Sequence, residues 1–167
     1  ARTWSRGVGK LLGLAFFLAS AISLPSHYTY SEFPRSPYRE AVLYLEGVIQ
    51  PGERVIHETK LSFFPAAFYA NDMEQEFLAD PPGSPNDTFE IGSQQAMRIV
   101  PQADIAAAAG NAEAGVRGVY FITFSQVFRE YAQSGITENP NLHWLEGHYR
   151  MVERKVFNDL EIYHFQR

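Results

Sequence analysis

The residues best suited to chemistry are four consecutive polar ones, 57–60, which follow a short apolar stretch. We predict a β-strand over 54–58, and the carboxyl end of such a strand is where open α/β sheets place ligands. Side chains alternate along a strand, so His57 and Glu58 should point to opposite faces of the sheet. His57, Glu58 and Lys60 are therefore candidate contact residues. The alternative, which we favour, is that they are strand-end polar groups that bond to backbone and water.

A second group of polar residues flanks a proline-rich stretch at 80–88. Its three prolines and Gly83 exclude both helix and strand, so we predict an exposed loop after a strand at 75–79. Asp80, Asp87 and Glu90 lie beside it without the alternating spacing of a calcium loop. We interpret them as a solvated acidic rim and as possible contact residues.

Other chemistries lack their residue patterns. The chain has no cysteine, which excludes disulfides, thiolate catalysis and cysteine metal sites. His143 and His148 are five residues apart on an expected helix, about 140° around its axis, which does not suit one shared metal ion. The glycines of 115–118 precede a strand instead of following one. Ser93 and Ser125 lack the glycine-flanked elbow of a hydrolase nucleophile. We predict no catalytic residue, no cofactor and no bound metal.

The elements that must position these residues are organised around 119–131. Residues 119–124 are almost all apolar, β-branched or aromatic, which predicts a strand buried on both faces. Ser125 follows as the expected N-cap of a helix that Gly135 closes. A strand that leads directly into a helix is typical of β-α-β units, so we expect a mostly parallel sheet covered by helices on both faces.

The rest of the chain supplies the other elements of this fold. Helices are expected from Ser36-Pro37 to about 49, over 62–68 with an apolar side of Phe63, Phe64, Ala67 and Phe68, over 89–100, from Asp104 to Gly110, and from Asn141. Residues 151–157 and 160–165 flank Asn158-Asp159 and predict an antiparallel hairpin at one edge. We therefore predict an α/β, three-layer, Rossmann-like sheet of about five strands. Its net charge of −5 and lack of a basic stripe argue against a nucleic-acid partner.

The N-terminus combines a basic flank with an uncharged run. Arg2, Arg6 and Lys10 occur without an acidic residue, and 11–24 carries no charge before Pro25. Counting from Gly7 gives eighteen residues, enough for a membrane span with Lys10 snorkelling. We expect a transmembrane helix and basic flank over 1–25, a linker over 26–35, and an extracytoplasmic domain over 36–167, since positive charge stays cytoplasmic. A cleavable signal peptide and a buried soluble helix are the alternatives.

Several stretches in a fixed order also resemble a known family. The apolar span is followed by 33–42, 49–53, 55–57, 60–65, 68–69 and 77–84. Together they resemble the C-terminal end of bacterial polytopic membrane glycosyltransferases related to protein O-mannosyltransferases and aminoarabinose transferases. In that family a last transmembrane helix leads into a small extracytoplasmic α/β domain. Its members take sugar from a polyprenyl-phosphate carrier and keep their catalytic acids in a first extracytoplasmic loop, which has no counterpart here.

Two functions follow from this resemblance and its limits. The chain is either the non-catalytic C-terminal part of such a transferase, in contact with acceptor or partner, or a single-pass accessory subunit that docks on a larger membrane complex. Its expected partners are the lipid bilayer and other transmembrane helices. Whether the polypeptide is a fragment or stands alone is left open, since Ala1 is also a natural N-terminus after methionine removal.

Overall fold

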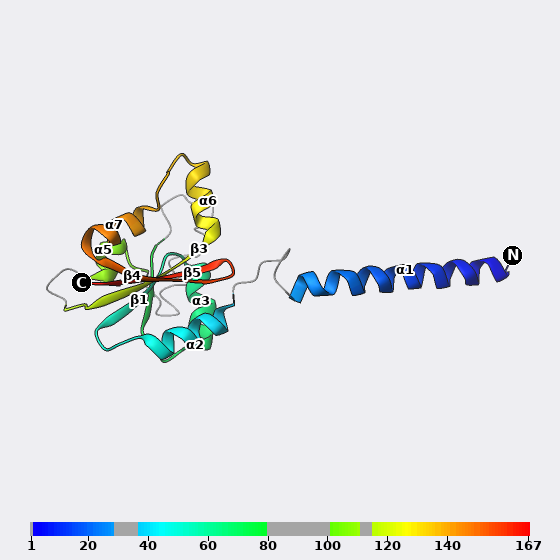
Figure 1. Ribbon diagram of the computed structural model, residues 1–167, viewed down its shortest axis with the longest axis horizontal. Coiled ribbons are helices and arrows are strands. Elements are labelled where there is room, and N and C mark those ends of the chain that lie inside the picture. The colour runs from blue at the N-terminus through cyan, green and yellow to red at the C-terminus, as the bar shows by residue number, and fades with distance from the viewer. Residues whose placement is uncertain (1, 29–36, 80–100, 111–114) are drawn as a thin grey trace. The chain divides into compact units, whose positions relative to one another are not determined.

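The computed structural model describes residues 2–28, 37–79, 101–110 and 115–167. It divides into two compact units, Ala1–Arg35 and Ser36–Arg167. The first unit contains a single helix, and the second is an α/β domain (Figure 1).

Helix α1 runs from Arg2 to Tyr28. Its stretch Gly7–Leu24 has a mean hydropathy of 1.8, and none of that stretch is buried, unlike the core helix of a soluble protein. Length and composition suit a membrane span, and they suit a signal sequence equally. The helix continues past Pro25, where we expected its end, because a proline near the last turn interrupts little of the hydrogen-bond ladder.

The domain is built on one mixed sheet of five strands in the order β2-β1-β3-β5-β4. The strands are β1 (Glu53–His57), β2 (Gln75–Phe77), β3 (Gly118–Phe124), β4 (Arg150–Phe157) and β5 (Leu160–Gln166). β1 is parallel to β2 and β3, whereas β5 is antiparallel to β3 and β4. The α/β fold with a five-stranded sheet is thus confirmed, but the sheet is mixed and not mostly parallel as predicted, and a Rossmann-like fold is not confirmed. The C-terminal hairpin pairs with β3 through its second strand, β5. The sheet therefore contains two antiparallel pairs, β3–β5 and β5–β4.

Helices cover both faces of this sheet (Figure 1). On one face lie α5 (Ile105–Ala109), α6 (Ser125–Gln133) and α7 (Pro140–His148), over a core that includes Ile56, Val119, Phe121, Leu145 and Phe165. On the other lie α2 (Tyr38–Val48) and α3 (Lys60–Tyr69), over a core that includes Leu45, Val55, Tyr120, Ile122 and Ile162. Residues of β3 contribute to both cores, which confirms it as the central buried strand.

Local signals explain some of the helix and turn boundaries. The Asp104 side chain accepts a hydrogen bond from the Ala107 N–H at 2.8 Å and caps α5, as predicted. Asn158 adopts φ 55° in the hairpin turn, which confirms the expected positive φ. Ser125, expected as an N-cap, is instead the first residue of α6, and its hydroxyl donates to Glu161.

The predicted apolar side of α3 is correct only in part: the rings of Phe63 and Phe64 pack against that of Phe77, but Phe68 does not face the core. Phe68 is 81% exposed, whereas Ser62 and Ala66 are buried. The helix is turned so that the small residues Ala66 and Ala70 pack close to Val42 of α2, which moves Phe68 outward. The predicted helix over 89–100 and the proline-rich loop over 80–88 lie outside the described residues.

Candidate functional site

The candidate site lies where the chain leaves β1 and β3. These strands are parallel neighbours, with His57 paired to Ile122, so their carboxyl ends adjoin. After β1 the chain enters α3 on one face of the sheet, and after β3 it enters α6 on the other face (Figure 1). β2 lies beyond β1, and β5 lies beyond β3. Such a switch in direction opens the crevice where α/β sheets bind ligands.

Glu58, the first residue after β1, accepts hydrogen bonds from four side chains at this end of the sheet. Its Oε1 accepts from Asn139 Nδ2 at 2.8 Å, from Asn141 Nδ2 at 3.1 Å and from the Tyr131 hydroxyl at 3.3 Å. Its Oε2 accepts from the hydroxyl of Thr123. Glu58 is only 6% exposed. The carboxylate therefore joins the sheet to α6 and to the start of α7.

Burial and hydrogen bonding act on Glu58 in opposite directions. Burial raises the pKa of its carboxyl group, and the hydrogen bonds from Thr123, Asn141, Asn139 and Tyr131 offset only part of that rise. Tyr131 responds in turn: burial and the nearby charge of Glu58 raise its pKa to about 12. The phenol thus stays protonated at neutral pH and remains a donor to the carboxylate.

A second carboxylate, Glu161 of β5, lies beside this network. Its Oε1 accepts from the Ser125 hydroxyl at 2.9 Å. Its Oε2 accepts from the Tyr163 hydroxyl at 2.6 Å and forms an ion pair with Arg154 Nη2 at 2.7 Å. Burial alone would raise the pKa of Glu161, but the hydrogen bonds from Tyr163, Ser125 and Arg154 outweigh it and lower the pKa. Glu161 is therefore held as the anion.

Thr123 lies between the two carboxylates. It is paired with Glu161 across β3 and β5, and its hydroxyl donates to Glu58 on the β1 side. Its side chain is fully buried. Because directly paired residues share a face, both carboxylates lie on the face that carries α6 and α7. Each is already engaged by donors of the protein itself, a geometry suited to holding elements together.

His57 lies on the opposite face, as the alternation of the strand predicted. It is fully buried, its Nε2 lies 2.9 Å from Gln75 Oε1, and its ring meets that of Phe63 edge-on. Burial lowers the pKa of His57 to about 4, so the ring is neutral at pH 7. Lys60, at the start of α3, is also buried. Neither residue is part of an exposed contact surface.

A small hollow lies beside the elements that carry this network. It has a volume of about 250 Å³. It is lined by the first turns of α3 and α6 and by the β4–β5 turn, through Thr59, Leu61, Phe124, Gln126, Val127, Glu130 and Asp159. The hollow therefore opens at the junction of β1 and β3 that their topology marks as a ligand position.

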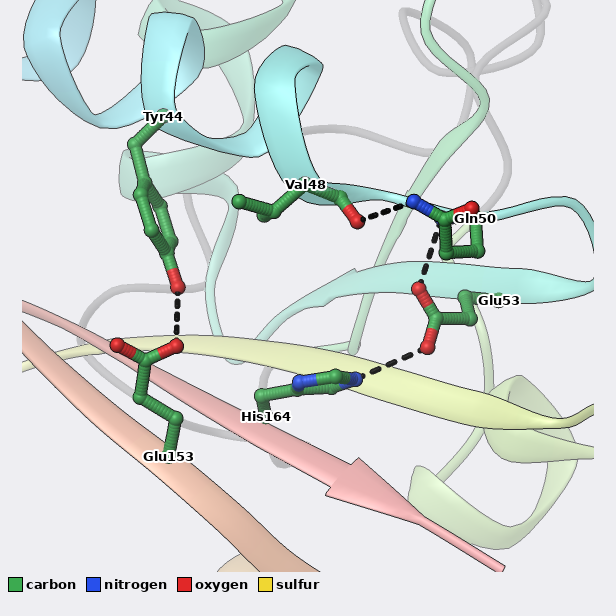
Figure 2. A network of polar contacts seen from close by, with 6 residues as sticks. All are labelled: Tyr44, Val48, Gln50, Glu53, Glu153 and His164. Atoms are coloured by element: carbon green, nitrogen blue, oxygen red, sulfur yellow. Dashed lines mark hydrogen bonds and ion pairs between the residues drawn. The ribbon is translucent and has the colours of Figure 1, made fainter.

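A separate network of polar contacts occupies the other end of β1 (Figure 2). Glu53 Oε2 accepts from the Gln50 N–H at 2.8 Å, and Glu53 Oε1 lies 2.9 Å from His164 Nε2. The His164 ring stacks on Tyr120 with centroids 4.1 Å apart. Glu53 thus joins the turn before β1 to β5 across the intervening β3.

The structure describes only some of the candidate contact residues that the sequence indicated. Glu58 accepts hydrogen bonds from four side chains, which the favoured interpretation did not include, and these partners lie 65 to 83 residues further along the chain. Asp80, Asp87 and Glu90 lie outside the described residues. Sequence reasoning missed all the partners of Glu58 and Glu161. Asn139, directly before Pro140, carried the one local signal, an N-cap followed by proline, and its Oδ1 does accept from the N–H groups of Asn141 and Leu142.

No protein-family model, curated protein or solved structure matches this chain.

The polar side chains of the site are joined to one another by hydrogen bonds and an ion pair. Over the ranges that the structure describes, no three His, Cys, Asp or Glu side chains gather in a way that would hold a metal ion. A general acid or base must reach the proton that it transfers. Glu58 and Glu161 instead face protein donors, so their geometry favours a positioning role.

Proposed function

We propose that this chain is a membrane-anchored, non-catalytic contact domain. One observation carries the proposal: Glu58 and Glu161, the two carboxylates at the ligand-binding end of the sheet, are each engaged by side chains of the domain. Carboxylates held in this way fix the surrounding elements and have little freedom to exchange protons with a substrate. The domain thus offers a rigid surface for contact.

The membrane anchor is the second part of the proposal. The stretch Gly7–Leu24 supplies the apolar length, and Arg2, Arg6 and Lys10 supply the positive flank. By the positive-inside rule the flank is cytoplasmic and the α/β domain is extracytoplasmic, periplasmic or at the cell surface. Protease added to sealed, right-side-out vesicles should digest the domain, whereas full protection would contradict this orientation.

The partner follows from the resemblance to polytopic glycosyltransferases that use polyprenyl-phosphate sugars. In that setting the domain contacts the acceptor or the transferase, and the transfer chemistry belongs to catalytic acids elsewhere. The test is to purify the full chain in detergent and assay it with polyprenyl-phosphate sugars and a panel of acceptors. No turnover above the buffer blank is expected. Turnover that Glu58→Gln or Glu161→Gln abolishes, in a variant with an unchanged circular dichroism spectrum, would overturn the non-catalytic role.

A single-pass accessory subunit is the second candidate. It is favoured by the single candidate span found within the described residues, since one helix cannot form a groove for a lipid carrier. Intact-mass measurement of the native polypeptide separates the two candidates. A mass near 18.9 kDa supports the accessory subunit, and a much larger mass supports the part of a transferase.

A further inference from the structure

Helix α3 exposes apolar side chains on the side that faces away from the sheet. Leu61 is 59% exposed, Phe68 81% and Tyr69 50%. Residues at such spacings, i, i+7 and i+8, lie along one side of a helix. We propose that this outer surface of α3, defined by these three residues, inserts into the interfacial layer of a lipid bilayer. The inference rests on the membrane anchor proposed above and adds a second point of contact with the same bilayer.

The composition of α3 is unusual for a helix at the surface of a domain. Only Lys60 and Ser62 are neither apolar nor aromatic, and both are buried. The inner side of the helix is covered, since Ala66 packs in one cluster with Val42 of α2. A surface helix normally has a polar outer side, whereas a helix that is apolar all round is covered on all sides. The outer surface of α3 therefore fits an apolar surrounding.

The chain itself limits the distance between this surface and the anchor. Helix α1 ends at Tyr28 and α2 begins at Tyr38, so nine residues separate them. Nine residues reach about 30 Å at most when fully extended, which is about the diameter of a small domain. The Tyr38 hydroxyl donates to the Leu61 carbonyl oxygen at 3.0 Å, so the start of α3 adjoins the point where the chain enters the domain. Such a tether gives a high effective concentration, and a few apolar side chains are then enough for docking.

The polar groups of this surface favour lipid over a protein partner. A protein interface carries about one hydrogen bond per 100–200 Å². Among the three side chains of the outer surface, only Tyr69 has a polar atom. Tyrosine is enriched at membrane interfaces, where its ring meets the apolar layer and its hydroxyl reaches the headgroups. The Phe68 ring packs edge-on against that of Tyr69, with centroids 5.3 Å apart, so the two rings form one compact aromatic group.

The charges indicate that the docking is apolar and not electrostatic. α3 has no acidic residue, and its one basic residue, Lys60, is buried. On the neighbouring helix α2, exposed residues of both signs occur, Arg39, Glu40 and Glu46. The whole chain has a net charge of −5, which does not favour anionic lipids. A zwitterionic bilayer should therefore be sufficient, and salt should not weaken the contact.

The test is fluorescence quenching by nitroxide lipids, with the full chain in phosphatidylcholine nanodiscs at one chain per disc. The chain has no cysteine, so a single introduced cysteine carries the fluorescent label. Tyr69→Cys places the label on the outer surface of α3. Val152→Cys places it on β4, at a residue that is 47% exposed, as the matched control. Leu18→Cys places it within the candidate span and reports on the anchor itself.

We expect the label at position 69 to lose fluorescence, and to lose more to a nitroxide near the headgroups than to one deep in the acyl chains. The reason is that interfacial helices lie only about 5–10 Å inside the headgroup boundary. The label at position 152 should keep its fluorescence. High salt should leave both results unchanged.

A substitution beside the label tests whether the apolar surface causes the docking. Phe68→Ser should lower the ratio of docked to free domain about tenfold or more, because a large aromatic side chain no longer leaves water. Phe68 is 81% exposed, so the fold should not depend on it, and circular dichroism checks this. Val156→Ser, at a residue of β4 that is 52% exposed, is the matched control and should leave the quenching at position 69 unchanged.

The label at position 18 separates this inference from the anchor. Quenching at 18 without quenching at 69 overturns the inference and leaves the anchor in place; the outer surface of α3 would then serve a protein partner. No quenching at 18 contradicts the anchor and this inference with it. Equal quenching at 69 and 152, loss of quenching in high salt, or undiminished quenching in folded Phe68→Ser would each overturn the apolar docking of α3.

Discussion

Strand β1 carries a buried glutamate near each end, and the two are used differently. Glu53 bonds to a backbone N–H three residues away and to His164 on the same sheet (Figure 2). Glu58 bonds to four neutral donors, three of which come from the segment that follows β3. One end of the strand is therefore fixed by contacts within the sheet and its adjoining turn. The other end joins two elements outside the sheet, α6 and the start of α7, to it.

The contacts of Glu58 matter because α6 has little else to hold it on the sheet. α6 has no buried residue of its own, so hydrophobic burial contributes little to holding it. Its attachment relies on Phe128, which packs against the core, and on hydrogen bonds from Ser125 and Tyr131 to the two carboxylates. We therefore infer that Glu58 is a positioning residue that keeps α6 and the start of α7 on the sheet, and with them the lining of the hollow.

Alanine substitution of the two glutamates should show the contrast most strongly. Glu58→Ala leaves four donors without their acceptor, each worth about 1–3 kcal/mol, partly offset by the lost cost of burying a carboxylate. We expect a fall of about 2–4 kcal/mol in the free energy of unfolding, against about 1–2 kcal/mol for Glu53→Ala. Urea unfolding of the full chain in detergent measures both. Equal losses would remove the distinction between the two ends.

A fall in pH should lower the stability of the fold through His57, the last residue of β1. Its pKa of about 4 lies below the ordinary 6.5, so the unfolded chain binds more protons than the folded chain between these values. Stability from this group is present above pH 6.5 and is lost as the pH falls toward 4, by about 3 kcal/mol in total. The raised pKa of Glu58 works in the opposite direction, since it favours the folded state at low pH and loses that contribution as the pH rises.

His57→Gln separates these two effects. The amide cannot titrate in this range and can still donate to Gln75. The loss of stability between pH 7 and pH 4 should therefore be smaller in the variant than in the wild type, by about 3 kcal/mol. Urea midpoints at the two pH values give the result. Parallel losses in both proteins would show that His57 titrates normally in the fold.

At the amino end of β1, Glu53 pairs with Gly118 of β3, where a larger side chain should destabilise the fold. A Cβ atom there would lie 2.8 Å from the Phe165 carbonyl oxygen and 2.9 Å from Glu53 Oε1. Gly118→Ala should cost about 1–3 kcal/mol, because the backbone of β5 cannot move aside. Gly147→Ala in α7 is the matched control, since nothing lies within 4 Å of its Cβ position. It should stabilise the protein by about 0.4–1 kcal/mol, so a similar sign for both variants would contradict the predicted clash.

The smallest expected difference in stability is between two tyrosine hydroxyl groups, one bonded to Glu58 and the other in the network that contains Glu53. Tyr131→Phe removes a partly buried hydrogen bond to Glu58 and should cost about 1 kcal/mol. Tyr44→Phe removes an exposed hydrogen bond of 2.7 Å to Glu153 (Figure 2) and should cost less than about 0.5 kcal/mol. Thermal unfolding of the pair is sufficient, and a larger cost at Tyr44 would contradict the predicted order.

Elements with strong local signals could be predicted from the sequence, and their assembly could not. The central strand, the Asp104 cap and the positive φ of Asn158 each depend on neighbouring residues. The sheet order depends on which strand of the hairpin pairs with β3, a long-range pairing that neighbouring residues do not determine. The site was harder still, because Glu58 meets donors 65 to 83 residues away, and no local spacing encodes such contacts.

Hydrogen exchange of the full chain in detergent tests the positioning role of Glu58 most directly. It should be measured by mass spectrometry on wild type, Glu58→Ala and Glu53→Ala. We predict faster exchange in Glu58→Ala over α6 and the start of α7, with β4 and β5 unchanged, because only that segment loses its attachment to the sheet. Glu53→Ala should leave α6 at the wild-type rate. Unchanged exchange over α6 in folded Glu58→Ala would contradict the assigned role.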